Sequence, residues 1–172
     1  MQRLIKGLIL VLCMGVFQVS IAQVAFQPDK LKPGQLKRYG NTALKGGDPL
    51  TAIDCFTRYL VDKPDDIGVK YSLAEAFRQS RDYKSALPLY KEVTETAGDK
   101  YPLAMLYYGL MQKANGDYEG ARTSLMKFRK DYKGEKDDGV YRSIALYAYK
   151  GAEIAAYYVD TVPLNVDIKN VG

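Results

Sequence analysis

The chain has 172 residues, of which 47% are hydrophobic and 26% charged, and its 25 basic and 20 acidic residues give a formal net charge of +5 at pH 7. This length suits one domain with a continuous core, and the small positive charge does not favour nucleic acid as a partner. The absence of histidine excludes Ser-His-Asp and Cys-His catalytic arrangements and histidine-containing zinc sites. We therefore expect no enzyme, no cofactor and no metal site.

Residues 1–22 have the pattern of a secretory signal peptide. Arg3 and Lys6 form a short basic region, residues 7–17 form an apolar run, and small residues lie three and one positions before a cut that would precede Gln23. The run is too short to predict a helix that crosses a bilayer. We expect removal of this segment and export of the mature chain, with a retained amino-terminal anchor as the alternative.

A linker is expected over residues 23–32, and beyond it a short motif recurs three times. Each copy is Gly-Asp-Tyr or a near equivalent, separated by two residues from an alanine. The alanines lie 34 and 35 residues apart, which is the period of an array of helical hairpins. Twelve residues before each alanine lies another small residue, so that two facing helices can approach closely. The two sets are Ala52, Ala86, Ala121 and Gly40, Ala74, Gly109.

The residues between these positions predict a helix, a tight turn and a second helix. Gly47 and Gly116 suit the left-handed position that ends a helix, and the aspartate after each suits the amino-terminal cap of the next helix. Cys55 lies beside the helical face of its neighbouring alanine, so a small buried hydrophobe is expected there. Bulky residues four and seven positions after each alanine share its helical face: Phe56, Tyr59, Tyr90, Val93, Leu125 and Phe128.

This combination of small residues, turn and bulky side chains resembles the tetratricopeptide repeat over about residues 33–133. The resemblance implies an all-α fold, an alpha-alpha superhelix in the form of a right-handed solenoid with three helical hairpins. Lys70 and Gln112 depart from the family pattern, which usually has a large apolar and an aromatic residue at these positions. The implied repeats are about 33–66, 67–101 and 102–135.

In this family the first helices of the hairpins line a concave groove that binds polypeptides, so the resemblance implies a non-catalytic protein–protein interaction scaffold. The alternative is that the groove positions are ordinary exposed residues of a spacer. The residues that match the groove positions combine cations, an amide and aromatic rings: Lys37, Asn41, Lys45, Tyr71, Glu75, Arg78, Tyr107, Leu110 and Lys113.

Two kinds of charged cluster have structural explanations. The acidic pairs Asp65-Asp66 and Asp137-Asp138 lie between expected helices, where turns and helix caps use aspartate. The basic cluster falls at the end of the sixth helix, where cations favour the helix dipole, so it does not predict a nucleic-acid site. Its members are Lys127, Arg129, Lys130, Lys133 and Lys136.

A further helix is expected over about residues 139–158, where it would cover the last exposed core face and complete a domain over 33–159. Four of its tyrosines, at positions 147, 149, 157 and 158, are expected to pack. Residues 160–172 are expected to form an extended tail, because Leu164, Val166 and Ile168 alternate with polar residues as in a strand.

The order of signal peptide, three repeats, alanine-rich helix and the tail Val-Asp-Ile-Lys-Asn-Val-Gly resembles the amino-terminal region of multidomain envelope proteins of Gram-negative bacteria. In those proteins the repeats precede a β-propeller and an OmpA-like peptidoglycan-binding domain, and some members belong to gliding or type IX secretion machinery. The resemblance implies a periplasmic scaffold in an envelope complex, with this chain as a truncated or split form. A free periplasmic peptide-binding or chaperone-like adaptor is the alternative.

Overall fold

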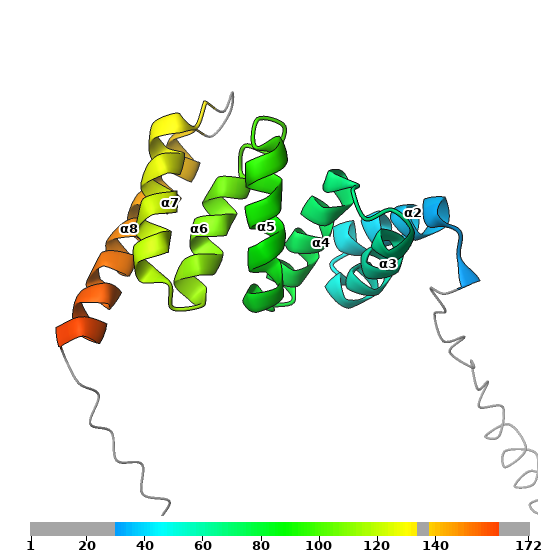
Figure 1. The fold of residues 1–172 in the computed structure, drawn as a ribbon, viewed down its shortest axis with the longest axis horizontal. Coiled ribbons are helices and arrows are strands. Elements are labelled where there is room, and N and C mark those ends of the chain that lie inside the picture. The colour runs from blue at the N-terminus through cyan, green and yellow to red at the C-terminus, as the bar shows by residue number, and fades with distance from the viewer. Residues whose placement is uncertain (1–29, 134–137, 162–172) are drawn as a thin grey trace, which may run out of the picture.

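The computed structural model describes residues 30–133 and 138–161, and in this part of the chain it contains helices and turns but no strand. Figure 1 shows the helices following one another along the long axis of the molecule, from α2 and α3 at one end to α8 at the other. The expected all-α superhelix, with three hairpins and a terminal helix, is confirmed. The helices are α2 Pro33–Lys45, α3 Pro49–Asp62, α4 Ile67–Gln79, α5 Tyr83–Ala97, α6 Ala104–Ala114, α7 Tyr118–Asp131 and α8 Asp138–Thr161.

Several predicted segments lie wholly or partly outside the described residues. These are the signal peptide over 1–22, most of the linker over 23–32, and the strand pattern of the tail over 162–172. Lys136 and Asp137 also lie outside them. The signal peptide and the strand-like tail therefore stay predictions.

The turn inside each hairpin uses the local chemistry that the sequence indicates. Gly47 and Gly116 have φ angles of +79° and +86°, and Arg81 takes the same left-handed position in the middle hairpin with φ of +66°. The aspartate after each of these residues caps the next helix, because its side chain accepts a backbone N–H bond. Asp48 accepts from Thr51 at 3.1 Å, Asp82 from Ser85 at 3.1 Å and Asp117 from Gly120 at 2.9 Å.

Small residues allow the two helices of each hairpin to touch. A Cβ atom added at Gly40 would lie 2.5 Å from Cε1 of Phe56, and one added at Gly109 would lie 2.8 Å from Cγ of Leu125. Ala74, the corresponding residue of the middle hairpin, is fully buried. The expected close approach is confirmed at Gly40 and Gly109.

The core is continuous because each apolar cluster joins a hairpin to the first helix of the next. Phe56 lies in the cluster of α2, α3 and α4, and Tyr90 lies in that of α4, α5 and α6. Leu125 and Phe128 lie in the third cluster, which α8 completes. Cys55 is fully buried, as expected. Each hairpin therefore needs its neighbour to bury its apolar face.

Polar partners accommodate the two departures from the repeat pattern. Nζ of Lys70 forms an ion pair with Oε1 of Glu92 on α5. The side-chain amide of Gln112 donates to Asp117 at 2.8 Å, and its oxygen accepts a hydrogen bond from the Ser124 hydroxyl at 2.6 Å. Gln112 is only 6% exposed, so these bonds satisfy a buried amide.

The terminal helix α8 closes the array and is longer than expected, since it includes residues 159–161. It buries small side chains against α6 and α7, and Arg142 donates to the carbonyl oxygens of Arg129 at 3.1 Å and of Tyr132 at 2.5 Å. The expectation that its tyrosines pack holds for Tyr149, which is half-buried. The same expectation is wrong for the other three, because no described helix covers their side of α8. Tyr147, Tyr157 and Tyr158 are 74%, 63% and 57% exposed.

Candidate partner-binding surface

The nine predicted partner-binding residues lie on the first helices of the three hairpins. Lys45 is exposed, and the other eight are half-buried. Contacts bring four of them together between α4 and α6, and Leu110 packs against the same apolar cluster as Tyr71 and Tyr107. The other four lie apart from this group. α2 carries Lys37, Asn41 and Lys45, α4 carries Tyr71, Glu75 and Arg78, and α6 carries Tyr107, Leu110 and Lys113.

A charged pair on α4 lies at the centre of this group. Nη2 of Arg78 donates to Oε2 of Glu75 at 2.5 Å, and Nε of Arg78 donates to the hydroxyl of Tyr90 on α5 at 3.3 Å. The Tyr90 hydroxyl in turn donates to the other carboxylate oxygen of Glu75. Burial alone would lower the pKa of Arg78, but the hydrogen bond and charge of Glu75 raise it above its ordinary value. The guanidinium therefore stays cationic.

Tyrosine rings surround this pair. The ring of Tyr71 stacks on that of Tyr101, with centroids 4.6 Å apart, and meets Tyr90 edge-on at 6.2 Å. Cζ of Arg78 lies 4.5 Å from the centroid of the Tyr107 ring, which is a cation–π distance. Burial raises the pKa of Tyr71, Tyr90 and Tyr107, so their hydroxyls stay protonated near neutral pH. We call this group the tyrosine–arginine cluster: Tyr71, Glu75, Arg78, Tyr90, Tyr101 and Tyr107.

The sequence did not indicate two members of the cluster. Tyr90 was expected only as a core residue, because helical spacing places its ring but does not show that its hydroxyl reaches Glu75. Tyr101 lies in the segment between α5 and α6, outside any helical period. A long aromatic residue immediately before the third repeat is the only sequence signal for it.

On α2, Lys37 is part of the fold. Its Nζ lies 2.8 Å from Oδ2 of Asp66 and 5.7 Å from the centroid of the Tyr59 ring. Asp66 also accepts from the Tyr59 hydroxyl at 2.8 Å and caps α4 by accepting from the backbone N–H groups of Gly68 and Val69. The hydrogen bond from Lys37, followed by that from Tyr59, lowers the pKa of Asp66 to about 2. Asp66 therefore has the capping role expected of the acidic pairs.

Asn41 and Lys45 lie further along α2, in a shallow depression of about 450 Å³. Three of its five lining side chains are cationic and none is acidic, so the depression carries positive charge, although Lys37 pairs with Asp66. Its lining residues are Gly34, Lys37, Arg38, Asn41, Thr42 and Lys45.

The last two predicted residues connect the third hairpin to its surroundings. Leu110 packs against both the second and the third apolar cluster. Lys113 reaches α8, where its Nζ lies 2.5 Å from the position that a Cβ atom at Gly151 would take. The ammonium of Lys113 thus lies against the backbone of the terminal helix.

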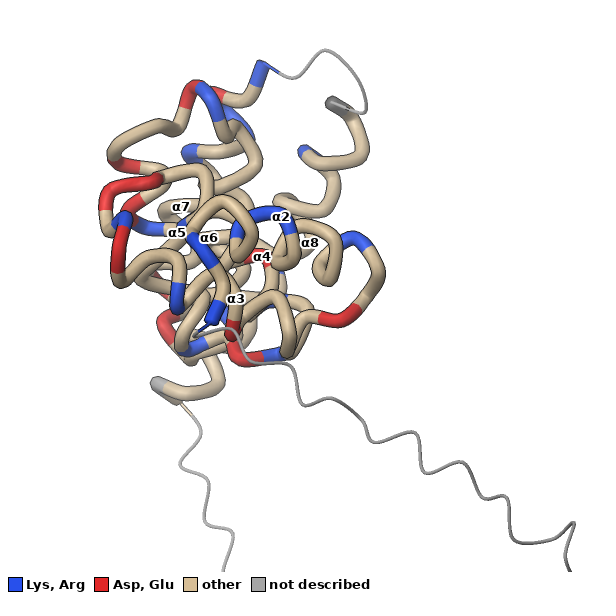
Figure 2. The backbone as a smooth tube through the Cα atoms, turned by 90° about the vertical axis from the view of Figure 1, so that its right-hand side faces the viewer, with Lys and Arg blue, Asp and Glu red and all other residues tan. Residues whose placement is uncertain are grey.

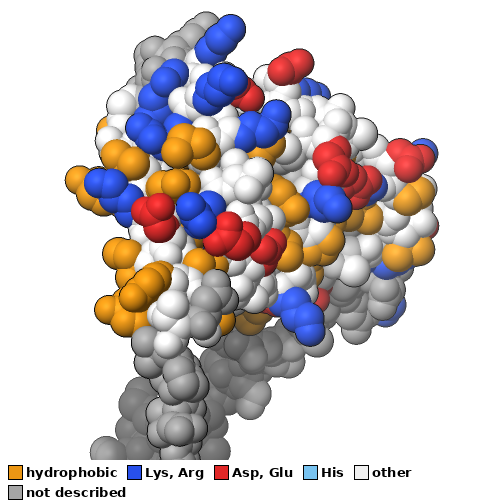
Figure 3. Space-filling view, turned by 60° about the vertical axis from the view of Figure 1, so that its left-hand side comes forward, with side chains coloured by type: hydrophobic (Ala, Val, Ile, Leu, Met, Phe, Trp, Pro, Cys, Tyr) orange, Lys and Arg blue, Asp and Glu red, His pale blue; other side chains and the backbone are white. Residues whose placement is uncertain are grey.

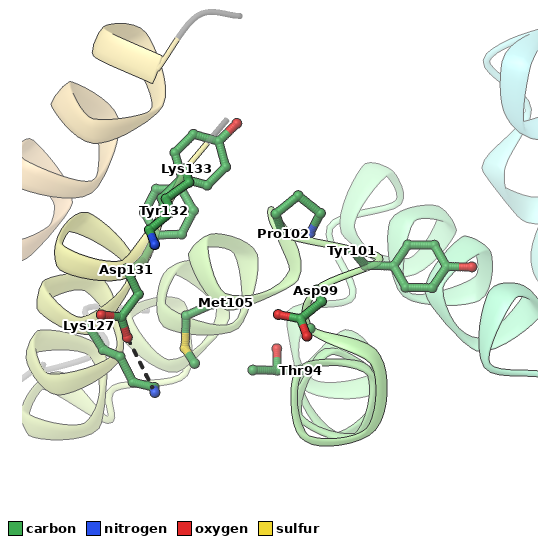
Figure 4. A pocket seen from close by; sticks show the side chains of 11 residues that line it. Thr94, Asp99, Tyr101, Pro102, Met105, Lys127, Asp131, Tyr132 and Lys133 are labelled. Carbon is green, nitrogen blue, oxygen red and sulfur yellow. Dashed lines mark ion pairs between the residues drawn. The ribbon is translucent and has the colours of Figure 1, made fainter. Parts of the chain in front are cut away.

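A second cleft, of about 470 Å³, opens between the ends of α5 and α7 (Figure 4). Nζ of Lys127, a member of the basic cluster, lies 3.5 Å from Oδ2 of Asp131 beside it. Figure 2, which views the array end-on, shows both acidic and basic residues around it. The basic cluster therefore does not form a uniform positive patch. The cleft is lined by Thr94, Gly98, Asp99, Tyr101, Pro102, Met105, Lys127, Phe128, Asp131, Tyr132 and Lys133.

Residues 30–133 and 138–161 contain neither a cluster of metal ligands nor a helix that could span a bilayer. No three histidine, cysteine, aspartate or glutamate side chains come together there as metal ligands would. Within the same ranges, every helix is too short or too polar to cross a bilayer.

Paired helices that stack on a shared core, joined by turns that end in a capping aspartate, define an α-solenoid repeat protein. A family model described as tetratricopeptide repeat matches residues 38–102 and 71–127, which together span just over half of the chain. The chain belongs to the tetratricopeptide repeat family. This fold supports a role as a protein–protein interaction scaffold and is a non-catalytic scaffold fold.

The crystal structure of the Sgt2 TPR domain from Aspergillus fumigatus is similar to this chain, with a TM-score of 0.56. The similarity covers 81% of this chain and 90% of that domain at 21% sequence identity, so it concerns the fold alone. No curated protein matches the chain.

Proposed function

We propose that this chain is a periplasmic scaffold that holds a partner polypeptide on the face formed by α2, α4 and α6. The tyrosine–arginine cluster is the observation that carries the proposal. Its rings and charges are held by contacts within the chain before any partner arrives, so binding would order few side chains. Tyrosine and arginine are also the residue types that most often dominate the affinity of protein interfaces.

The two parts of this face suit different parts of a partner. Arg78 and Glu75 satisfy each other, so the cluster offers aromatic surface and tyrosine hydroxyls more than free charge. The depression around Lys45 offers cations. A segment with an aromatic or apolar side chain for the cluster and acidic residues for α2 would match both.

The cellular part of the proposal rests on the pattern of residues 1–22 and on the order of segments along the chain. In it, the signal peptide is removed and the mature chain docks a partner in or beside an envelope complex. That complex would be of the kind in which repeats accompany an OmpA-like domain, including gliding or type IX secretion machinery. Mass spectrometry of chain recovered from the periplasm would then give a product that begins at Gln23. Recovery only of the uncut chain in the cytoplasm would contradict this part.

Affinity capture from a periplasmic extract tests the binding face. The variant Lys45→Glu/Tyr107→Ala changes the charge of the depression and removes the ring beside Arg78, without removing either member of the half-buried Arg78–Glu75 pair. We expect recovery of the wild-type partner to fall at least about tenfold, as for loss of a hot spot. Lys130→Glu, on the exposed side of α7, is the matched control and should retain the partner. Equal recovery with both variants, each folded by circular dichroism, would remove this face from the proposal.

A further inference from the structure

The terminal helix carries an apolar stripe that the described part of the chain leaves exposed, except at Gly151, where the side chain of Lys113 lies. Six positions spaced alternately by four and three residues follow one side of α8: Val140, Ile144, Tyr147, Gly151, Ile154 and Tyr158. The five side chains other than glycine are 40% to 74% exposed. Apolar side chains gather along this end of the molecule in Figure 3. Alternation of four and three is the spacing by which helices pair along a seam. We call these six residues the α8 seam.

The α8 seam is distinct from the face with which α8 closes the array. That face consists of Ala145, Ala148 and Ala152, which lie in the third apolar cluster. Arg142 secures it through the carbonyl oxygens at the end of α7. The seam is therefore displayed on a helix that is already held in place, and a partner would not need to order it.

We propose that the α8 seam binds the α8 seam of a second copy of this chain, in a two-fold symmetric dimer with the two helices antiparallel. The spacing of the seam residues is the same from either end of α8. A two-fold axis at the level of residue 149 therefore places every seam residue opposite a seam residue of the second copy. Ile144 then lies opposite the partner's Ile154, and Val140 lies opposite the partner's Tyr158. A symmetric dimer requires this self-complementarity.

The sizes of the paired residues also agree with this register. Tyr147, the most exposed residue of the seam, lies opposite Gly151, the one seam position without a side chain. Nζ of Lys113 lies beside Gly151. The ring of the partner's Tyr147 would meet this ammonium, and a cation over a tyrosine ring is a favourable contact.

The exposed area is sufficient for a weak specific dimer. The exposed fractions of Tyr147 and Tyr158 add up to more than one whole tyrosine, which is on the order of 250 Å² per copy. The three aliphatic residues expose a similar area, so two copies would bury on the order of 1,000 Å², the lower limit for a specific interface.

The charged groups beside the α8 seam are all basic. None of the six seam residues is charged, but Lys150 is adjacent to them and the ammonium of Lys113 on α6 lies beside Gly151. The two-fold axis brings the two copies of Lys150 near each other, so salt should strengthen the dimer by screening them. An interface based on opposite charges would weaken in salt. The dimer would also present two partner-binding faces, which goes beyond the proposed function of one chain.

Sedimentation of the protein, expressed with its own amino-terminal segment, tests the proposal. We expect a dimer for the wild type and at least about tenfold weaker association for Ile144→Lys and for Ile154→Glu, since each change occurs twice in the dimer. The double variant Ile144→Lys/Ile154→Glu should recover the dimer, because each lysine then lies opposite a glutamate of the partner. Val61→Glu, which changes an aliphatic residue 70% exposed on α3, is the matched control and should leave the dimer intact.

Two results would overturn the proposal. A wild-type protein that stays monomeric up to about 100 µM would show that a second copy does not occupy the seam. A dimer that both single variants leave unchanged would place the contact elsewhere. Disulfide cross-linking is an independent test of how the two helices are aligned. Ile144→Cys/Ile154→Cys should yield a covalent dimer, whereas Ile144→Cys alone should not, because its two copies would lie ten residues apart along the helices.

Discussion

Replacement of Asp66 by asparagine tests the ion pair between Asp66 and Lys37. An asparagine can still cap α4, so the change removes mainly the charge that pairs with Lys37. The pKa of Asp66 falls from 3.8 to about 2, which corresponds to about 2 kcal/mol of stability. The Lys37 side chain is 44% exposed, so solvent screening reduces the expected loss for Asp66→Asn to about 1–2 kcal/mol at pH 6.

The pH dependence of this loss has a definite sign. A carboxyl whose pKa is lower in the folded chain contributes stability that is complete above its ordinary pKa of 3.8 and that is lost as pH falls toward about 2. Urea unfolding followed by circular dichroism should therefore show a gap between wild type and Asp66→Asn at pH 6 that closes by about pH 2. The exposed neighbour Asp65, changed to asparagine, is the control and should show no gap. A gap that persists unchanged to pH 2, or none at pH 6, would refute the role of the charge.

Three further outcomes are expected. Gly40→Ala should destabilise the chain by about 1–3 kcal/mol in thermal melts, because its Cβ would meet the ring of Phe56, whereas Gly34→Ala, with no atom within 4 Å, should not destabilise it. Arg81→Gly should raise the unfolding free energy by up to about 1 kcal/mol, since it relieves a left-handed backbone; a loss would count against strain there. Burial raises the pKa of Cys55, so a thiol reagent should label it only as fast as the protein opens, and rapid labelling of folded protein would contradict its burial.

The repeats, turns and caps could be predicted because each depends on chemistry within a few residues. A glycine before Asp48 or Asp117 indicates a left-handed turn and a cap regardless of the rest of the chain. The position of Arg81 could be aligned by period alone, although its side chain gives no reason for a positive φ. Small residues at Gly40 and Gly109 indicate contact between helices because bulky partners recur at fixed spacings after them.

The candidate site could be predicted only in part, because its contacts depend on how neighbouring helices lie. Spacing indicates that Tyr71, Glu75 and Arg78 share one face of α4. It does not show that Tyr90 reaches across to Glu75, nor that Lys37 on the preceding hairpin pairs with Asp66. Both contacts join residues on different elements, and the distances between elements are set by packing of the core.

The terminal helix shows why an apolar pattern alone does not identify the buried face. Both the alanine face and the seam of α8 are apolar, and the helix buries the alanines. Alanine lets two backbones approach closely, so the third apolar cluster is sealed by the smaller residues. The isoleucines and tyrosines are then left outside, where their larger surface is available to a partner.

Lys113 connects the two proposed surfaces, because it belongs to the predicted partner-binding face and its ammonium lies beside Gly151 of the α8 seam. A partner that binds this ammonium would withdraw it from the position where the second copy's tyrosine would meet it. Coupling between two binding equilibria is reciprocal, so dimerisation would then change partner affinity by the same factor. Partner affinity measured on the monomeric Ile154→Glu variant should therefore exceed that of the wild-type dimer, after correction for two faces per dimer, and Lys113→Met should abolish the difference. Equal affinities would mean that the two surfaces act independently.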